Sequence, residues 1–363
     1  MTNDRSALPK LKKSDSARFT TRDLEEGTPA GKVVHLIGSV DDDVFRFLEP
    51  AASALADAAI EQSIVFVHSP QMHRLRPRIH VSVRVVVAPP TKNPLRRWVW
   101  ALRAFRNELV RSPTQGVHLY GLLPRLVGTW MARRAGIAIA LQHAAYKRTA
   151  PAAEVTPLTA AAQPSVARVE RPVSAEFFAV PRHEARHPLI VTGSHSSSPH
   201  DADLFAQLAV LLGDSELGLA FNWIGSIDDA SRLRLKAAQV GVFPVNTTAE
   251  WASRLAAGWV YLAPGGESGF PSLLVEAMAV GLPCVAVDTP DHRSIVRHGE
   301  SGYLCRTAEE MVNCIAPLID SVELRRKIGQ AARRDIEERF DETRFREALF
   351  AAYDLPIKTP HAA

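Results

Sequence analysis

The stretch that most constrains this chain is residues 259–287, in its second half. A short apolar run at 259–263 ends in Pro264-Gly265-Gly266, and after a loop residues 272–280 follow as an apolar helix pattern closed by Gly281. A second apolar run, residues 283–287, comes directly afterwards. Strand, glycine-rich loop, helix and strand in this order form one βαβ unit of a parallel sheet. The stretch therefore predicts an α/β fold.

The predicted helix that begins at Ser272 gives this unit a chemical role. The first turn of a helix has backbone N–H groups without intrahelical partners and the positive end of the helix dipole, so it suits a phosphate. Glu276 lies four residues after Ser272 on the same helix. A carboxylate there would repel a phosphate, but it can accept hydrogen bonds from sugar hydroxyls. The alternative interpretation is an ordinary core unit with a solvated glutamate.

This segment resembles the donor site of family 4 glycosyltransferases, which have the GT-B fold. The resemblance rests on Gly269-Phe270-Pro271, on Glu276-Ala277-Met278-Ala279 and on Gly281-Leu282-Pro283. One departure concerns the two acidic residues that the family places eight positions apart. Here Glu267 and Glu276 are nine apart, and alignment on Phe270 places Ser268 at the position of the first glutamate. Either the loop has one extra residue or the first carboxylate is replaced.

Length and composition fit a protein of two globular domains. The chain has 363 residues, 46% of them hydrophobic and 23% charged, with a net charge of +4. No nucleic-acid-binding motif appears, and no apolar run approaches the roughly 20 residues of a membrane helix. The three cysteines have no metal-binding spacing, which favours a reducing, cytoplasmic location.

The order of apolar runs predicts two doubly wound domains, and the resemblance implies a GT-B arrangement of two facing Rossmann-like domains. Residues 1–31 are polar and are expected to form a mobile tail. An Ala/Pro-rich stretch at 148–167 is interpreted as a linker. Asp341 is expected to cap a final helix that returns to the first domain. The predicted parts are 1–31 (tail), 32–147 (acceptor-side domain), 148–167 (linker), 168–340 (nucleotide-sugar-binding domain) and 341–355 (final helix).

The resemblance assigns roles to residues of the second domain. Glu276 is expected to bind the ribose of the nucleotide, and Glu267 or Ser268 the hydroxyls of the donor sugar. Backbone N–H groups at the start of the helix would face the diphosphate or the donor sugar. The residues concerned are Gly269, Phe270, Pro271, Ser272 and Leu273.

A second departure concerns positive charge. The family has a Gly-Arg pair after the first strand of this domain and a lysine five residues later. Here Gly193 is followed by Ser194, and Pro199 stands at the position of the lysine. Since a leaving diphosphate gains charge in the transition state, another cation is needed. His195, His200 and Arg293 are candidates, and we favour Arg293 because its guanidinium is always charged and binds phosphate through two hydrogen bonds.

In the first domain, His118 and His143 are expected to act in catalysis. Val117-His118-Leu119-Tyr120 resembles a family strand end, and Gln142-His143 resembles a loop histidine after the next strand. For each histidine a structural role is equally plausible. No DxD-type motif is present, so no metal ion is expected. No cofactor is expected either, apart from a UDP- or GDP-linked sugar donor as co-substrate.

The predicted function is a retaining, metal-independent glycosyltransferase that moves a hexose from a nucleotide diphosphate sugar to a hydroxyl acceptor, a glycan or a lipid-linked one. The resemblance implies bacterial polysaccharide or glycolipid synthesis at the cytoplasmic face of the membrane. Two alternatives remain: a binding or scaffold protein that has lost catalysis, and a nucleotide-sugar epimerase. Residues 92–111 mix five arginines with apolar side chains. They are either a surface helix or a contact with anionic lipid headgroups.

Overall fold

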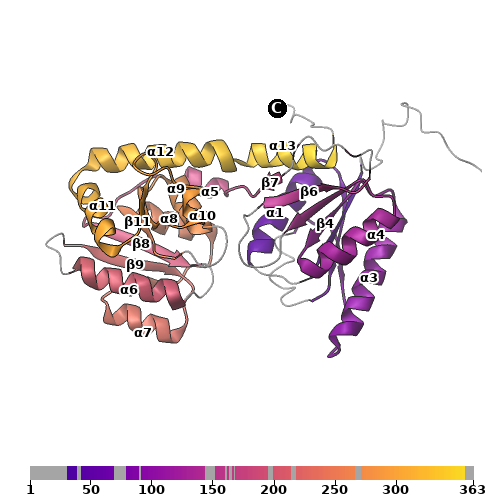
Figure 1. Cartoon of the computed structure of the whole chain (residues 1–363), viewed down its shortest axis with the longest axis horizontal. Helices are drawn as coiled ribbons and strands as arrows, with labels where there is room; N and C mark the ends of the chain where they lie inside the picture. Colours follow the sequence, from indigo (N-terminus) through magenta and orange to yellow (C-terminus); the bar gives the residue numbers. More distant parts are fainter. Residues whose placement is uncertain are drawn as a thin grey trace, which may run out of the picture.

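A computed structural model of the chain describes residues 31–38, 42–68, 79–89, 91–143, 152–159, 162, 166, 168–194, 199–213, 218–265 and 271–355. These residues form two lobes that lie side by side, each built on one twisted sheet (Figure 1). The predicted tail, apart from Gly31, falls outside the described residues.

The first sheet has seven strands in the order β3-β2-β1-β4-β5-β6-β7. The first five are parallel, and β6 and β7 are antiparallel to their neighbours. The central strand β1 is mostly apolar and all of its residues are buried, because helices cover both faces of the sheet. The strands are β1 (Lys32–Ile37), β2 (Glu61–Phe66), β3 (Arg84–Val87), β4 (Gly116–Tyr120), β5 (Ile139–His143), β6 (Ala152–Pro157) and β7 (Arg168–Glu170).

Helices cover both faces of this sheet. One face packs against α1 (Asp42–Asp57) and, from the far end of the chain, α13 (Glu342–Tyr353). The other face packs against α3 (Pro94–Arg111) and α4 (Thr129–Arg134), which follows a π-helical turn, η1 (Pro124–Gly128). The first domain is therefore a three-layer α/β/α unit, as its sequence predicts.

The second sheet has six parallel strands in the order β10-β9-β8-β11-β12-β13. The chain thus runs outward from β8 to one edge and then from β11 to the other, which is the doubly wound order that binds ligands where the order reverses. The strands are β8 (Leu189–Ser194), β9 (Ala220–Gly225), β10 (Gly241–Phe243), β11 (Val260–Ala263), β12 (Cys284–Val287) and β13 (Tyr303–Cys305).

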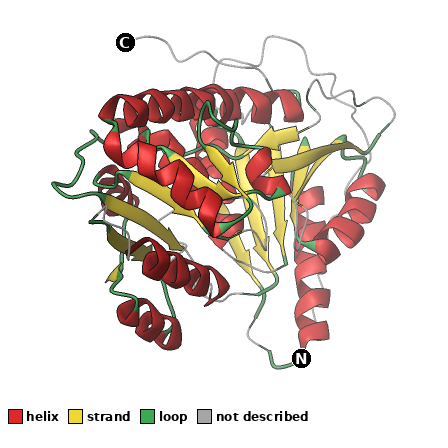
Figure 2. Ribbon diagram, turned by 60° about the vertical axis from the view of Figure 1, so that its left-hand side comes forward, coloured by secondary structure: helices red, strands yellow, loops and turns green. Residues whose placement is uncertain are grey.

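Two hydrophobic clusters enclose this second sheet, which Figure 2 shows between its helix layers. One face packs against α5, α8, α9 and α12, and the other against α6, α7 and α11. The helices are α5 (Ala175–Ala179), α6 (Pro199–Gly213), α7 (Asp229–Ala237), α8 (Thr248–Ala256), α9 (Ser272–Val280), α10 (Pro290–Arg293), α11 (Ala308–Asp320) and α12 (Val322–Phe340).

The last helix returns to the first domain, as predicted. The Asp341 carboxylate caps α13 by accepting hydrogen bonds from the backbone N–H groups of Thr343 and Arg344. Phe345 and Leu349 are buried against the first sheet, and the Phe345 ring meets the edge of Phe47 at 5.3 Å. In Figure 1, α12 and α13 run along one side of the molecule and span both lobes.

The predicted linker at 148–167 is wrong in part. Residues 152–157 form β6, of which residues 153–157 pair with β5, and β7 pairs with β6 in turn. The first sheet therefore extends to Glu170, and the chain crosses between the domains just after it. Pro157 is compatible with this strand because it lies at the strand end, where a missing N–H costs little.

Candidate functional site

A cavity of about 550 Å³ lies between the two domains. Its walls come from α1, from the crossing segment after β7, from the carboxyl ends of β8 and β9, and from α8, α9 and α13. The lining residues are Arg46, Glu49, Pro50, Ser53, Arg171, Pro172, Val173, Ser174, Ala175, Phe177, Ser194, Gly225, Ser226, Val245, Asn246, Thr247, Thr248, Trp251, Glu276 and Glu342. Clefts at the carboxyl ends of such strands are the usual binding place in doubly wound folds.

Glu276 lies at this cavity although it belongs to an almost wholly buried helix. Residues 274–280 of α9 are all buried, and Gly281 ends the helix in the left-handed conformation with φ 85°. Glu276 is only 6% exposed, so it is not the solvated surface residue of the alternative interpretation. A buried carboxylate needs charged or hydrogen-bonding partners.

One partner of Glu276 comes from the opposite domain. Arg46 Nη1, on α1, donates to Glu276 Oε1 at 2.8 Å. The two residues are separated by 230 positions, and both line the cavity. Sequence reasoning missed Arg46, because nothing in the sequence near α1 indicates a contact with the second domain.

A second arginine lies at the start of α9. Arg171, just after β7, is 5% exposed, and its Nη2 donates to Ser272 Oγ at 3.0 Å. Ser272 is the first residue of α9, so the guanidinium lies beside the first turn of the helix that was predicted to face a phosphate. Sequence reasoning missed Arg171 too, because its contact with Ser272 joins residues 101 positions apart.

Gly193 and Ser194 end β8 at the point where the strand order reverses. Ser194 is buried and lines the cavity. A side chain at position 193 would not fit, since a Cβ there would lie 2.2 Å from the backbone oxygen of Ile224. The glycine thus allows β8 and β9 to approach closely at the floor of the cleft.

His118 does not reach the cleft. It lies in the middle of β4, is fully buried, and stacks with Tyr120 at 4.3 Å and with His35 at 5.3 Å under the ring of Phe47. Burial lowers the pKa of the neighbouring His35 to about 4, as expected for a neutral aromatic core. This geometry argues against the predicted catalytic role of His118, because its side chain contacts Phe47 of α1 and does not line the cavity. His143 ends β5 and pairs with Ala153.

Arg293 does not line the cavity. It ends α10, its side chain is 55% exposed, and Nε and Nη2 bind the two carboxylate oxygens of Asp288 at 2.5 and 2.9 Å. Hydrogen bonds from Arg293 and Arg306 hold the pKa of the Asp288 carboxyl well below its usual range. The Arg293 guanidinium is thus committed to a carboxylate, which argues against its predicted role at a diphosphate.

The structure describes only part of the predicted loop. Pro271 is the N-cap residue of α9, and Ser272 and Leu273 form its first turn. Glu267, Ser268, Gly269, Phe270 and His195 lie outside the described residues. In the part of the chain that the structure describes, no group of three metal-ligating side chains is found.

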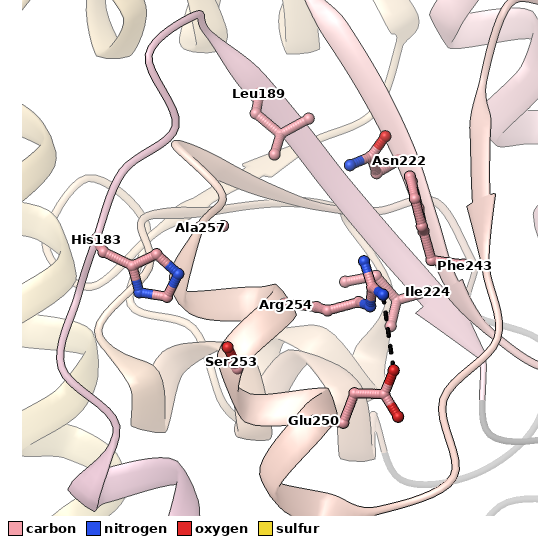
Figure 3. A pocket seen from close by; sticks show the side chains of 9 residues that line it. All are labelled: His183, Leu189, Asn222, Ile224, Phe243, Glu250, Ser253, Arg254 and Ala257. Atoms are coloured by element: carbon pink, nitrogen blue, oxygen red, sulfur yellow. Dashed lines mark ion pairs between the residues drawn. The ribbon is translucent and has the colours of Figure 1, made fainter.

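A smaller cavity of about 300 Å³ lies beside the short edge strand β10 (Figure 3). Its charged side chains already interact with one another: Arg254 Nη2 lies 3.6 Å from Glu250 Oε1, and its guanidinium lies 4.6 Å from the centre of the Phe243 ring. This cavity has the character of a packing gap rather than of a polar binding site.

Two doubly wound domains that face each other across a cleft, with the last helix returning to the first domain, define the GT-B fold. Residues 220–335 match the model of the family described as glycosyl transferases group 1. The resemblance in the sequence thus predicted the fold and agrees with this family match.

Solved structures share this fold, and one curated relative resembles part of the chain. A glycosyltransferase from Rickettsia africae aligns with a TM-score of 0.69 at 12% identity, over 89% of this chain and 98% of its own. Anabaena HepE, crystallised with UDP and glucose, aligns with a TM-score of 0.61 at 12% identity, over 87% of this chain and 97% of its own. An uncharacterized glycosyltransferase from Haemophilus influenzae is 38% identical over 77 residues, 20% of this chain. That match covers 22% of the length of the relative.

Gly193→Ala tests the close approach at the floor of the cleft. The new Cβ would meet the Ile224 carbonyl, which belongs to a strand and cannot turn away, so we expect a loss of about 1–3 kcal/mol in the free energy of unfolding. Gly213→Ala is the control, because a Cβ there meets nothing within 4 Å. Urea unfolding measures both. Equal stability of the two variants would show that β8 and β9 can separate without cost.

Proposed function

We propose that this protein is a glycosyltransferase that moves a hexose from a UDP- or GDP-linked donor to a hydroxyl acceptor. The proposal includes retention of the anomeric configuration, catalysis without a metal ion, and a role in bacterial polysaccharide or glycolipid synthesis. The group 1 domain at residues 220–335 and the UDP bound by Anabaena HepE support the class of reaction.

The observation that carries the proposal is Glu276 at the interdomain cavity. Its carboxylate lies one turn into α9, while the first turn of the same helix, beside Arg171, is suited to phosphate. A nucleotide diphosphate has both parts, a ribose for the carboxylate and phosphates for the helix start and the guanidinium. The spacing of these groups on one helix fits such a ligand.

Arg171 takes the role that the sequence suggested for Arg293. In the transfer, the bond between the anomeric carbon and the phosphate oxygen breaks and a bond to the acceptor oxygen forms on the same face of the sugar. The acceptor proton passes to the leaving diphosphate, whose negative charge grows as the bond breaks. A buried guanidinium next to the helix start would stabilise that charge most in the transition state.

A membrane-bound acceptor is consistent with the surface of the first domain. The exposed residues of α3 include Leu95, Val99, Arg103, Arg106 and Val110. Along residues 91–143 the acidic residue is Glu108, which is buried and bonded to Lys32.

More exposed apolar side chains lie close to the start of α3. Leu122, Leu123, Leu126 and Trp130 are 48–63% exposed. The start of η1 neighbours α3, since a Cβ on Gly38 would lie 3.1 Å from Pro124 and 3.4 Å from Trp98. We propose that this basic and apolar surface contacts the anionic inner face of the membrane. None of the described helices is long and apolar enough to cross a bilayer.

The first prediction concerns the donor. The wild-type protein should bind UDP or GDP, and Glu276→Ala should weaken that binding by about 1.5–3 kcal/mol through loss of a charged hydrogen bond to the ribose. Isothermal titration measures both, and a circular dichroism melt checks the fold. Unchanged affinity in the variant would remove Glu276 from the binding site.

Product analysis with the same protein separates the alternatives. Transfer of the hexose to an acceptor supports the proposal. Isomerised nucleotide-sugar without acceptor would identify an epimerase, and binding without turnover under any acceptor would identify a scaffold.

The second prediction concerns the cation at the diphosphate. Arg171→Ala should lower kcat by about 100-fold while nucleotide affinity falls much less, because the leaving charge develops in the transition state. Arg171→Lys keeps the charge but not the paired N–H groups, so its kcat should lie between those of the wild type and Arg171→Ala. If Arg293→Ala lost more kcat than Arg171→Ala, Arg293 and not Arg171 would be the residue that stabilises the leaving diphosphate.

The third prediction concerns the membrane. Arg103→Glu combined with Arg106→Glu should reduce co-sedimentation with anionic vesicles, and binding by the wild type should fall as salt rises. Arg326→Glu combined with Lys327→Glu is the matched control, since it makes the same charge change at exposed positions of α12. Equal sedimentation with neutral and anionic vesicles would contradict the proposal.

A further inference from the structure

The ion pair between Arg46 and Glu276 joins the two domains across the cleft. Arg46 is on the first helix of the first domain, and Glu276 is on the helix proposed to bind the donor. The Glu276 side chain is 8% exposed and that of Arg46 is 23% exposed, so solvent screens the pair less than it would a surface pair. The donor-binding carboxylate thus has a partner in the domain that is proposed to hold the acceptor.

We infer that Arg46 is a positioning residue, which orients the Glu276 carboxylate toward the ribose of the donor when the two domains are closed. This inference rests on the proposed function. The inference goes beyond the proposed function because it assigns part of the donor site to the first domain.

The chemistry of the carboxylate allows this arrangement. An ionised carboxylate has two oxygens and about four acceptor positions, so one guanidinium contact at Oε1 is compatible with hydrogen bonds from ribose hydroxyls. The hydrogen bond from the guanidinium also restrains the rotamer of the Glu276 side chain. A carboxylate held in place binds a hydroxyl with less loss of side-chain entropy than a mobile one does.

The geometry also couples donor binding to closure of the cleft. Removing one partner of a buried ion pair destabilises the charge that remains, so the contact with Arg46 matters most while Glu276 is buried. In an open cleft, water would solvate both groups. A donor that binds to the oriented carboxylate therefore favours the closed arrangement by its difference in affinity between the two states.

A different reading of the same contact gives the opposite prediction. If Arg46 occupied the place of the ribose, it would compete with the donor, and its removal would strengthen binding. The experiment below separates the two.

The test is a mutant cycle measured by isothermal titration with UDP or GDP, whichever the wild type binds, and with the 2′,3′-dideoxy form of the same nucleotide. Arg46→Gln and Glu276→Gln should each weaken binding of the ribonucleotide about tenfold or more. The double variant should be no weaker than Glu276→Gln alone, because the two residues act through one contact. With the dideoxy nucleotide, the effect of Arg46→Gln should shrink to less than about twofold.

Arg346→Gln is the matched control. It removes an arginine that pairs with Asp57 of the same helix α1, at 3.8 Å and outside the cavity lining. Its ribonucleotide affinity should stay within about twofold of the wild type. Arg46→Lys should restore part of the affinity that Arg46→Gln loses.

Several results would overturn the inference. Tighter ribonucleotide binding by Arg46→Gln would make Arg46 a competitor, and equal losses with both nucleotides would assign it a general charge or folding effect. Unchanged binding by Arg46→Gln beside weakened binding by Glu276→Gln would refute the inference and leave the proposed function standing. If the wild type binds neither the ribonucleotide nor its dideoxy form, both the inference about Arg46 and the proposed function are refuted.

Discussion

The packing of α13 against the first domain is the contact on which the two-lobed arrangement depends. Phe345, Leu349 and Tyr353 are buried in the core of a domain whose other strands and helices lie more than 170 positions earlier in the chain. A Cβ on Gly116 would lie 2.4 Å from the Tyr353 ring, so the strand β4 accepts this helix only with a glycine at that place. The chain therefore crosses between the domains twice, once after β7 and once at Phe340.

The two crossings are joined to each other. The backbone N–H of Val173 donates to the carbonyl of Phe340 at 2.8 Å, and Val173 also lines the cleft. The two crossing segments of the chain are thus joined by a hydrogen bond beside the cleft.

Much of the fold could be predicted from the sequence, because buried parallel strands leave continuous apolar runs and their helices leave caps and glycines. The βαβ unit around α9 was predicted from its apolar runs and glycines, and the helix start at Asp341 was predicted from its capping side chain. The antiparallel strands β6 and β7 were missed, since their short, proline-containing sequence lacks that apolar signal and their pairing depends on β5.

The site was less predictable. Glu276 follows from a local motif, whereas Arg46 and Arg171 reach it only through tertiary contacts. His118 and Arg293 had suitable chemistry, but the pleat of β4 buries the first and Asp288 engages the second.

The return of α13 also has a consequence for the order of synthesis. A ribosome makes the strands of the first domain early, yet the helix that completes their core is made after the whole second domain. Until then the surface that α13 covers, including Phe47 and Gly116, stays open to other hydrophobic chains. The core of the first domain is therefore completed only after the second domain has been translated. A nascent chain that ends before residue 342 lacks α13 and leaves this core incomplete.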